Sequence, residues 1–239
     1  MDQQKNQPRT LTVPAYAKLN LTLDILGKRS DGYHEMRMVM QTISLHDDVT
    51  VTLGGESGIR CRVSGAELPS DEHNLAVRAA EVLCKELKLS NQGIDIALEK
   101  RIPSEAGMAG GSADAAAVLR ALRALCAPEV NDRRLEKIAA AIGSDVPFCV
   151  RGGTQLAEGR GEVLTVLKSA PALYAAVCKP DFPISTPALF ACVDGVELRG
   201  RPDSSAMLRA IDRGDAQALC AQVGNVFEQA LEDAQRACI

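Results

Sequence analysis

The chain has 239 residues, of which 46% are hydrophobic and 24% charged, and its formal net charge is −4 at pH 7. These proportions are typical of a folded globular protein and exclude a long disordered chain. The small negative charge argues against a nucleic acid as the main partner, because a phosphate backbone requires a basic face. Small acidic ligands remain compatible with this charge, since a few local cations suffice to bind them.

The cysteines and the first residues predict the compartment. The eight cysteines are scattered and no two form a CxxC pair, a pattern that predicts small buried residues in a reducing environment rather than disulfides or a metal site. The opening MDQQKNQPRTLTV lacks the apolar core of a signal peptide, and no later segment is apolar over the length that spans a bilayer. We therefore expect a cytoplasmic protein without a membrane or nucleic acid partner.

Alternating apolar and polar residues predict a strand over residues 15–26, AYAKLNLTLDIL. The alternation predicts a half-buried strand, with Lys18 and Asn20 on its polar face. The same pattern predicts further strands of antiparallel type at residues 49–53, 58–63 and 93–100.

Helical spacing of apolar residues predicts three helices in the same half of the chain. The first follows Asn74, a plausible N-cap, and the second lies in the alanine-rich stretch 113–125. The third begins after Asn131 and ends at Gly143. Strands come first and helices are then interleaved with them, so the sequence predicts an α+β layer structure.

Glycines and charges crowd together over residues 151–163, RGGTQLAEGRGEV. They place a domain boundary near residue 160, although a hairpin turn within one domain explains the glycines nearly as well. Beyond this point we expect one strand in ALYAAVCKP, residues 172–180, and short helices.

The stretch RIPSEAGMAGGSADAAAVL, residues 101–119, carries three glycines directly before a serine and an alanine-rich helix. A helix N-terminus has unpaired N–H groups and attracts anions, and glycines allow the backbone to approach phosphate oxygens closely. Ser112 could cap the helix and offer its hydroxyl to phosphate or to magnesium. The stretch matches neither GxxxxGK[ST] nor GxGxxG. A flexible turn before a tightly packed helix is the alternative reading.

Phosphoryl transfer also requires groups that offset charge and orient the attacking hydroxyl. Asp145 precedes Pro147 in GSDVPF, on a constrained loop that could hold its carboxylate toward a cleft. Lys18 could pair with it and stabilise charge on the hydroxyl or the phosphate. Taken singly, each is also consistent with an ordinary solvated side chain.

A turn in RSDGYHEM, at Asp31 and Gly32, places Tyr33 and His34 at its tip. An aromatic face beside a ring that donates and accepts hydrogen bonds suits stacking on a base and reading its edge, whereas a plain hairpin is the alternative. In ISTPALF, Thr186 is expected to cap a helix whose first turn contains Phe190, a residue that judged alone favours the core.

Together these motifs resemble the GHMP kinase superfamily. AYAKLNLTLDILGKRSDGYHEM, IPSEAGMAGGSADAAAVL and GSDVPF occur in the order and approximate spacing of members that act on a cytidine-diphosphate-linked substrate. The resemblance implies a first domain, residues 1–160, similar to the second domain of ribosomal protein S5, and a ferredoxin-like second domain, residues 161–239, that is incomplete. It implies ATP-dependent phosphorylation of a hydroxyl of a cytidine-diphosphate-linked methylerythritol in non-mevalonate isoprenoid biosynthesis, with ATP and magnesium as cofactors.

Residue roles follow from the same resemblance. Lys18 and Asp145 match the catalytic pair. Substrate-binding positions are matched by Asn20, Tyr33, His34, Thr186 and Phe190, with Tyr33 and Phe190 expected to sandwich the cytosine. The ATP phosphate loop is matched by Pro103, Ser104, Glu105, Ala106, Gly107, Met108, Ala109, Gly110, Gly111, Ser112 and Ala113, with Ser112 as a candidate magnesium ligand.

The sequence departs from the superfamily at its end. Members carry a further glycine-rich segment of the type SGSGST, whereas no glycine follows Gly224 here. This predicts either a truncated gene product or a protein that has lost part of its site, and an unpaired sheet edge in the second domain. Alternatives are another GHMP small-molecule kinase, acting on homoserine or mevalonate, and a nucleotide-binding protein without catalysis. We expect a monomer or a weak homodimer.

Overall fold

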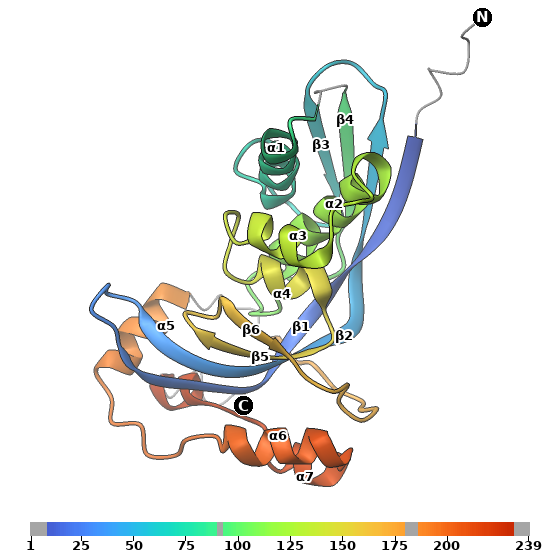
Figure 1. Cartoon of the computed structure of the whole chain (residues 1–239). Helices are drawn as coiled ribbons and strands as arrows, with labels where there is room; N and C mark the ends of the chain where they lie inside the picture. The colour runs from blue at the N-terminus through green and yellow to red at the C-terminus, as the bar shows by residue number, and fades with distance from the viewer. Residues whose placement is uncertain (1–8, 90–92, 180–185, 232–239) are drawn as a thin grey trace, which may run out of the picture. The chain divides into compact units, whose positions relative to one another are not determined.

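The computed structural model describes residues 9–89, 93–179 and 186–231, which form two compact units (Figure 1). The first unit contains Met1–Ala17, Ile43–Ser104 and Met108–Gly152, and the second contains Lys18–Thr42, Glu105–Gly107 and Gly153–Ile239. The sequence predicts a single division near residue 160. In the structure, each unit is instead built from several separate segments of the chain. Two long strands, β1 (Arg9–Lys28) and β2 (His34–Leu53), each contribute one part to each unit.

The sheet of the first unit has the order β3-β4-β2-β1. β4 (Ile94–Glu99) runs antiparallel to β2, from the pair Asp48↔Glu99 to the pair Leu53↔Ile94. β3 (Ile59–Ser64) runs parallel to β4, so the expectation of antiparallel strands was wrong for this pair. The period of two in the sequence reports which face is buried, and it carries no information on strand direction.

The described residues of the first unit also form the helices α1 (Leu75–Leu87), α2 (Gly110–Cys126), α3 (Asp132–Ala139) and α4 (Val146–Arg151). Asn74 and Asn131 are N-caps as predicted, since their side chains accept hydrogen bonds from the N–H groups of Ala76 and Arg134. α3 ends at Ala139, before the predicted stop at Gly143, and the chain continues in turns.

α2 is the buried centre of this unit. It packs against α1 and α4. Ala115, Ala116 and Ala117 are fully buried. Small side chains on consecutive positions let neighbouring elements approach closely, which is why an alanine-rich helix can be buried on most of its circumference.

The second unit contains a sheet of the order β6-β5-β2-β1-β7. β5 and β6 form an antiparallel hairpin, so the glycines around residue 160 belong to a turn within one unit, the alternative that the sequence leaves open. The elements of this unit outside β1 and β2 are β5 (Thr154–Gly159), β6 (Val163–Val166), α5 (Thr186–Asp194), α6 (Ser204–Arg213), α7 (Ala216–Cys220), β7 (Gly224–Asn225) and the 3-10 helix η1 (Val226–Ala230).

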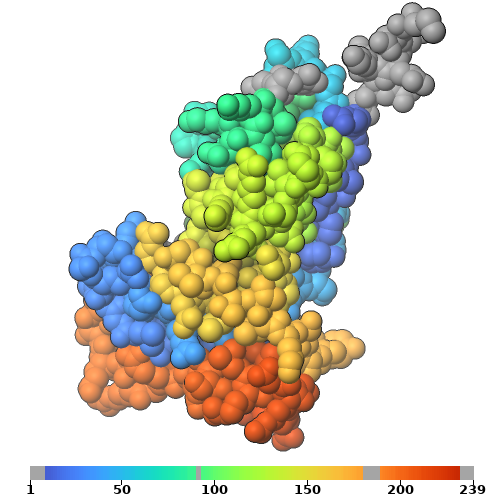
Figure 2. All heavy atoms as spheres, viewed as in Figure 1, coloured from blue at the N-terminus to red at the C-terminus, as the bar shows by residue number. Residues whose placement is uncertain are grey.

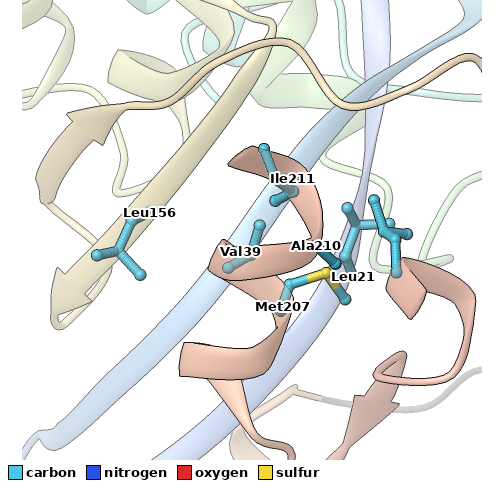
Figure 3. Packing of buried hydrophobic residues seen from close by; sticks show 7 residues of the cluster. Leu21, Val39, Leu156, Met207, Ala210 and Ile211 are labelled. Atoms are coloured by element: carbon cyan, nitrogen blue, oxygen red, sulfur yellow. The ribbon is translucent and has the colours of Figure 1, made fainter. Parts of the chain in front are cut away.

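The core of the second unit lies between α6 and the sheet (Figure 3). Met207 on α6 and Val39 on β2 are fully buried. Burial of a side chain of this size contributes roughly 1.5–3 kcal/mol each. The remaining members of the cluster are Leu21, Leu156, Ala210, Ile211 and Leu219.

The polar side of β1 is buried at three positions, which corrects the prediction of a half-buried strand there, whereas Asn20 on the same side is partly exposed. Lys18, Thr22 and Asp24 are all less than 9% exposed. Their polar atoms are paired: Thr22 accepts a hydrogen bond from the N–H of Val39, and Asp24 accepts one from Arg201 at 2.8 Å. The alternating pattern of β1 therefore places apolar side chains on one face of the strand and polar side chains, three of them buried, on the other.

Residues 172–179 do not form the predicted strand, and residue 180 lies outside the described part of the chain. They have no regular structure, and Tyr174 is fully exposed. Figure 2 shows this stretch, coloured between gold and orange, at the surface. A strand needs a partner for its N–H and C=O groups, so a favourable sequence alone does not produce one.

The cysteines are less buried than predicted. Cys84 and Cys149 are buried, whereas Cys178, Cys192 and Cys220 are exposed. Over residues 9–89, 93–179 and 186–231, no helix combines the length and the apolar character that a membrane crossing requires.

Candidate functional site: a glycine-rich loop before a buried helix

The loop between β4 and α2 has a backbone in which the sign of φ alternates. Glu105, Gly107 and Ala109 have φ values of +54°, +67° and +58°, whereas the residues between them are outside this region. Such alternation turns successive N–H groups toward one side and creates a concave site for an anion. Two of the three residues carry a Cβ atom, and each left-handed residue of that kind costs about 1–2 kcal/mol.

α2 begins at Gly110, and its N-cap is Ala109, whose side chain cannot cap the helix. Ser112 is the third helical residue and is partly exposed, so the prediction that it caps the helix was wrong. The loop ends at Ala109, which has a left-handed backbone, so the helix begins at Gly110, two residues before Ser112. The first N–H groups of the helix thus donate no hydrogen bond to an N-cap side chain, which leaves them suited to an anionic ligand.

Close packing favours glycine at Gly110. A Cβ atom there would lie 3.2 Å from Cγ2 of Ile102 and 3.6 Å from Nζ of Lys100. At Gly107, by contrast, no atom lies within 4 Å, and the positive φ alone favours glycine.

A buried charge cluster lies at the base of this loop, and it was missed in the sequence. Lys100 donates hydrogen bonds to Oδ2 of Asp47 and to Oδ2 of Asp114, the second at 2.5 Å. The three side chains are 3%, 0% and 2% exposed. Asp47 lies 53 positions and Asp114 14 positions from Lys100 in the sequence. The sequence therefore indicated the cluster only through charged residues that lie within predominantly apolar segments.

Burial raises the pKa of the Asp114 carboxyl to about 7, although Lys100 acts in the opposite direction. Oδ1 of Asp114 is buried and has no hydrogen-bond partner in the described part of the chain. Two carboxylates thus share one ammonium group in a site that excludes solvent.

Lys18 and Asn20, both predicted site residues, are brought together in the second unit. Nζ of Lys18 donates a hydrogen bond to Oδ1 of Asn20 at 3.1 Å, and Lys18 is 5% exposed. Both lie on β1, where the spacing of two residues places them on the same face.

Asp145 belongs to the first unit, as the residue that precedes α4. It occupies the N-cap position with φ −86° and ψ −13°, and its side chain makes no capping hydrogen bond. Pro147 in the first turn fixes the helix start, and Asp145 is partly exposed. The constrained position expected from GSDVPF is therefore present, and it is held by a helix that the sequence reading did not predict.

Tyr33 lies at the tip of the predicted hairpin in the second unit. Gly32 has φ +85°, and the N–H of Arg29 donates to the carbonyl of Tyr33 at 2.8 Å. Tyr33 is 55% exposed, and the guanidinium of Arg160 lies 4.7 Å from the centroid of its ring. The backbone N–H of Tyr33 is the main cause of the lowered pKa of Asp31, which it binds.

His34 and Phe190 are in contact. Their rings are stacked at 4.7 Å with an interplanar angle of 16°, and Phe190 meets Phe227 edge to face. Nε2 of His34 lies 2.7 Å from Oδ1 of Asp194, whose pKa is lowered chiefly by this hydrogen bond. Phe190 thus stacks on a histidine in the structure, and the sandwich with Tyr33 stays a prediction.

Thr186 is the first described residue of α5, and the residues before it lie outside the described part of the chain, so its role as a cap stays a prediction. Its side chain lies outside the described part of the structure.

Comparison with known proteins identifies the family. Residues 74–153 match the GHMP kinases N terminal domain. The 4-diphosphocytidyl-2-C-methyl-D-erythritol kinase of Clostridium tetani is 43% identical over 218 residues, 91% of this chain and 77% of that protein. The enzyme of the same name from Geobacillus kaustophilus is 46% identical over 220 residues, 92% of this chain and 75% of that protein.

Solved structures agree with this assignment. A crystal structure of 4-(cytidine 5'-diphospho)-2C-methyl-D-erythritol kinase matches with a TM-score of 0.75 and 33% identity, over 95% of this chain and 78% of that chain. A homoserine kinase from Cytophaga hutchinsonii, with a TM-score of 0.65 and 17% identity over 100% of this chain and 77% of that chain, shares the fold. The predicted α+β fold of a GHMP kinase is thus confirmed. The chain belongs to the 4-diphosphocytidyl-2-C-methyl-D-erythritol kinase family of the GHMP kinases.

Proposed function

We propose that this chain transfers a phosphoryl group from ATP to a hydroxyl of 4-diphosphocytidyl-2-C-methyl-D-erythritol, a step of non-mevalonate isoprenoid biosynthesis. The observation that carries the proposal is the loop of alternating φ at the N-terminus of α2, in a chain that belongs to this kinase family. The backbone there fits a chain of phosphates, because it offers N–H groups without requiring a basic side chain.

The nucleotide would be held by the loop Pro103–Ala113. Its alternating residues and the first turn of α2 would donate N–H groups to the phosphate oxygens. Magnesium would offset charge between those phosphates, and the partly exposed hydroxyl of Ser112 is a suitable oxygen ligand for it.

Asp145 would accept the proton of the substrate hydroxyl as the oxygen bonds to the γ-phosphorus, and ADP leaves with the bridging oxygen. Lys18 would hold the hydroxyl and offset the developing charge. Its burial strengthens such an interaction, because the ammonium group is screened little by water.

Recognition of the cytidyl group would fall to the second unit. Tyr33 offers an exposed aromatic face. His34, the next residue in the sequence, forms a stacked pair with Phe190 of α5. Asn20 and Thr186 complete the proposed substrate-binding residues.

The acceptor is tested by measuring ADP release with a panel of candidate substrates. ADP is expected with 4-diphosphocytidyl-2-C-methyl-D-erythritol and not with homoserine, mevalonate or CDP. Release with homoserine or mevalonate but not with the cytidyl substrate would show that another GHMP kinase activity is the correct one.

The replacement Gly107→Ala tests the phosphate loop. Its φ of +67° lies where alanine is strained, while the space around it is open, so the change acts on the backbone alone. An unbound loop with alanine here relieves about 1–2 kcal/mol of strain by leaving the left-handed conformation, and because binding must restore it, the KM for ATP is expected to rise roughly 5-fold to 30-fold. Gly27→Ala is the control, because Gly27 has open space and no positive φ. An ATP KM that is equal in both variants would contradict a role of this loop in binding.

A further inference from the structure

Both ends of the proposed phosphate loop are attached to the buried charge cluster. Lys100 directly follows β4, and Asp114 is the fifth residue of α2. One ammonium group thereby connects the strand that enters the loop with the helix that leaves it.

Asp47 fixes the two residues that directly precede the loop through a second set of hydrogen bonds. Its Oδ1 accepts hydrogen bonds from the N–H groups of Arg101 and Ile102, the latter at 2.8 Å, while its Oδ2 accepts one from Lys100. Ile102 in turn packs against the position where a Cβ of Gly110 would lie. The start of the loop and the start of the helix are thus held against each other.

The loop between these ends is strained. Glu105 and Ala109 keep left-handed conformations without being glycine. Such conformations persist only where the surrounding structure enforces them, and the cluster is the buried structure that fixes both flanks.

Neither stability nor attraction of the ligand accounts for the cluster. Buried ion pairs are often replaced by apolar residues with no loss of stability. Two carboxylates with one ammonium also leave a negative excess when ionised, which repels phosphate. A geometrical role remains.

We propose that Asp47, Lys100 and Asp114 are positioning residues for the nucleotide, a buried anchor that holds β4 and α2 so that the loop directs its N–H groups at the phosphates. The anchor rests on the proposed function insofar as the ligand of the loop is ATP.

The test uses two variants of the full chain. Asp114→Asn keeps the size of the side chain and weakens the connection to α2. Lys100→Met/Asp114→Leu replaces the connection by apolar contact and remains informative if the first variant does not fold. Asp48→Asn is the control, because Asp48 is a neighbouring residue of β2 that pairs with Arg101 at the surface.

The expected result is a selective loss of nucleotide affinity. In folded samples of either anchor variant, the KM for ATP and the Kd for ADP rise about tenfold, equivalent to 1.4 kcal/mol. The KM for the cytidyl substrate stays at the wild-type value in these variants. In Asp48→Asn, the KM for ATP and the Kd for ADP also stay at the wild-type values. A merely structural role would lower the melting temperature and leave the KM for ATP unchanged, and that result would overturn the anchor.

Failure of the proposed function gives a different pattern. If the wild-type chain binds ADP but transfers no phosphate, the function is wrong, and the Kd for ADP in the variants still decides on the anchor. If the wild-type chain binds no adenine nucleotide, both proposals are wrong.

Discussion

Asp145→Asn is expected to abolish phosphoryl transfer while nucleotide binding is retained. Asparagine keeps the shape of the side chain at the start of α4, but it cannot take up the proton of the substrate hydroxyl. Loss of a positioned acid-base group costs about 10²–10⁴ in rate. The measurements are kcat by coupled ADP release and the Kd for ADP by calorimetry on the same sample.

Asp132→Asn is the control for this change. Asp132 is an exposed carboxylate of the same unit, at the first residue of α3, where it binds Arg123. If Lys18 and Asp145 cooperate in the same catalytic step, adding Lys18→Met to Asp145→Asn lowers kcat only slightly further, since the effects of cooperating residues are not additive. Turnover of Asp145→Asn at the wild-type rate would refute its assignment.

Lys100→Met is expected to cause a large loss of stability in the first unit. The change leaves Asp47 and Asp114 buried beside each other without their cation. Removing one partner of a buried ion pair costs roughly 3–5 kcal/mol, a large share of the stability of a typical domain. Urea unfolding followed by circular dichroism measures the change in the free energy of unfolding.

Lys85→Met is the matched control, because Lys85 is an exposed lysine in the last turn of α1. Adding Asp114→Leu to Lys100→Met is expected to restore part of the lost stability, because it removes one of the unpaired carboxylates. If Lys100→Met unfolds at the same urea concentration as Lys85→Met, the buried cluster is not a cooperative part of this unit.

Features encoded by neighbouring residues could be predicted from the sequence. The caps at Asn74 and Asn131 and the turn at Gly32 depend on local hydrogen bonds and on φ, so a short stretch suffices to recognise them. The glycine-rich loop before α2 belongs to the same class, because its glycines precede a strong helix-forming segment, whereas its binding of phosphate stays a proposal.

Features that depend on distant residues could not be predicted in this way. The burial of Lys18 and Asp24 follows from the elements that cover β1, and Asp24 is paired with Arg201, 177 positions away. The charge cluster at Lys100 likewise joins three elements, each of which looks ordinary alone.

Two further differences have the same cause. The direction of β3 relative to β4 depends on how the connection through α1 returns to the sheet. The absence of a strand at residues 172–179 depends on whether a partner is present, because the residues themselves favour one.

The most direct test of the account is phosphorus NMR of the reaction of this chain with ATP and 4-diphosphocytidyl-2-C-methyl-D-erythritol. A new phosphomonoester resonance is expected to grow in step with the β-phosphate signal of ADP, and it should be missing with Asp145→Asn. ATP that binds to the chain and persists unchanged beside the cytidyl substrate would contradict the proposed kinase activity.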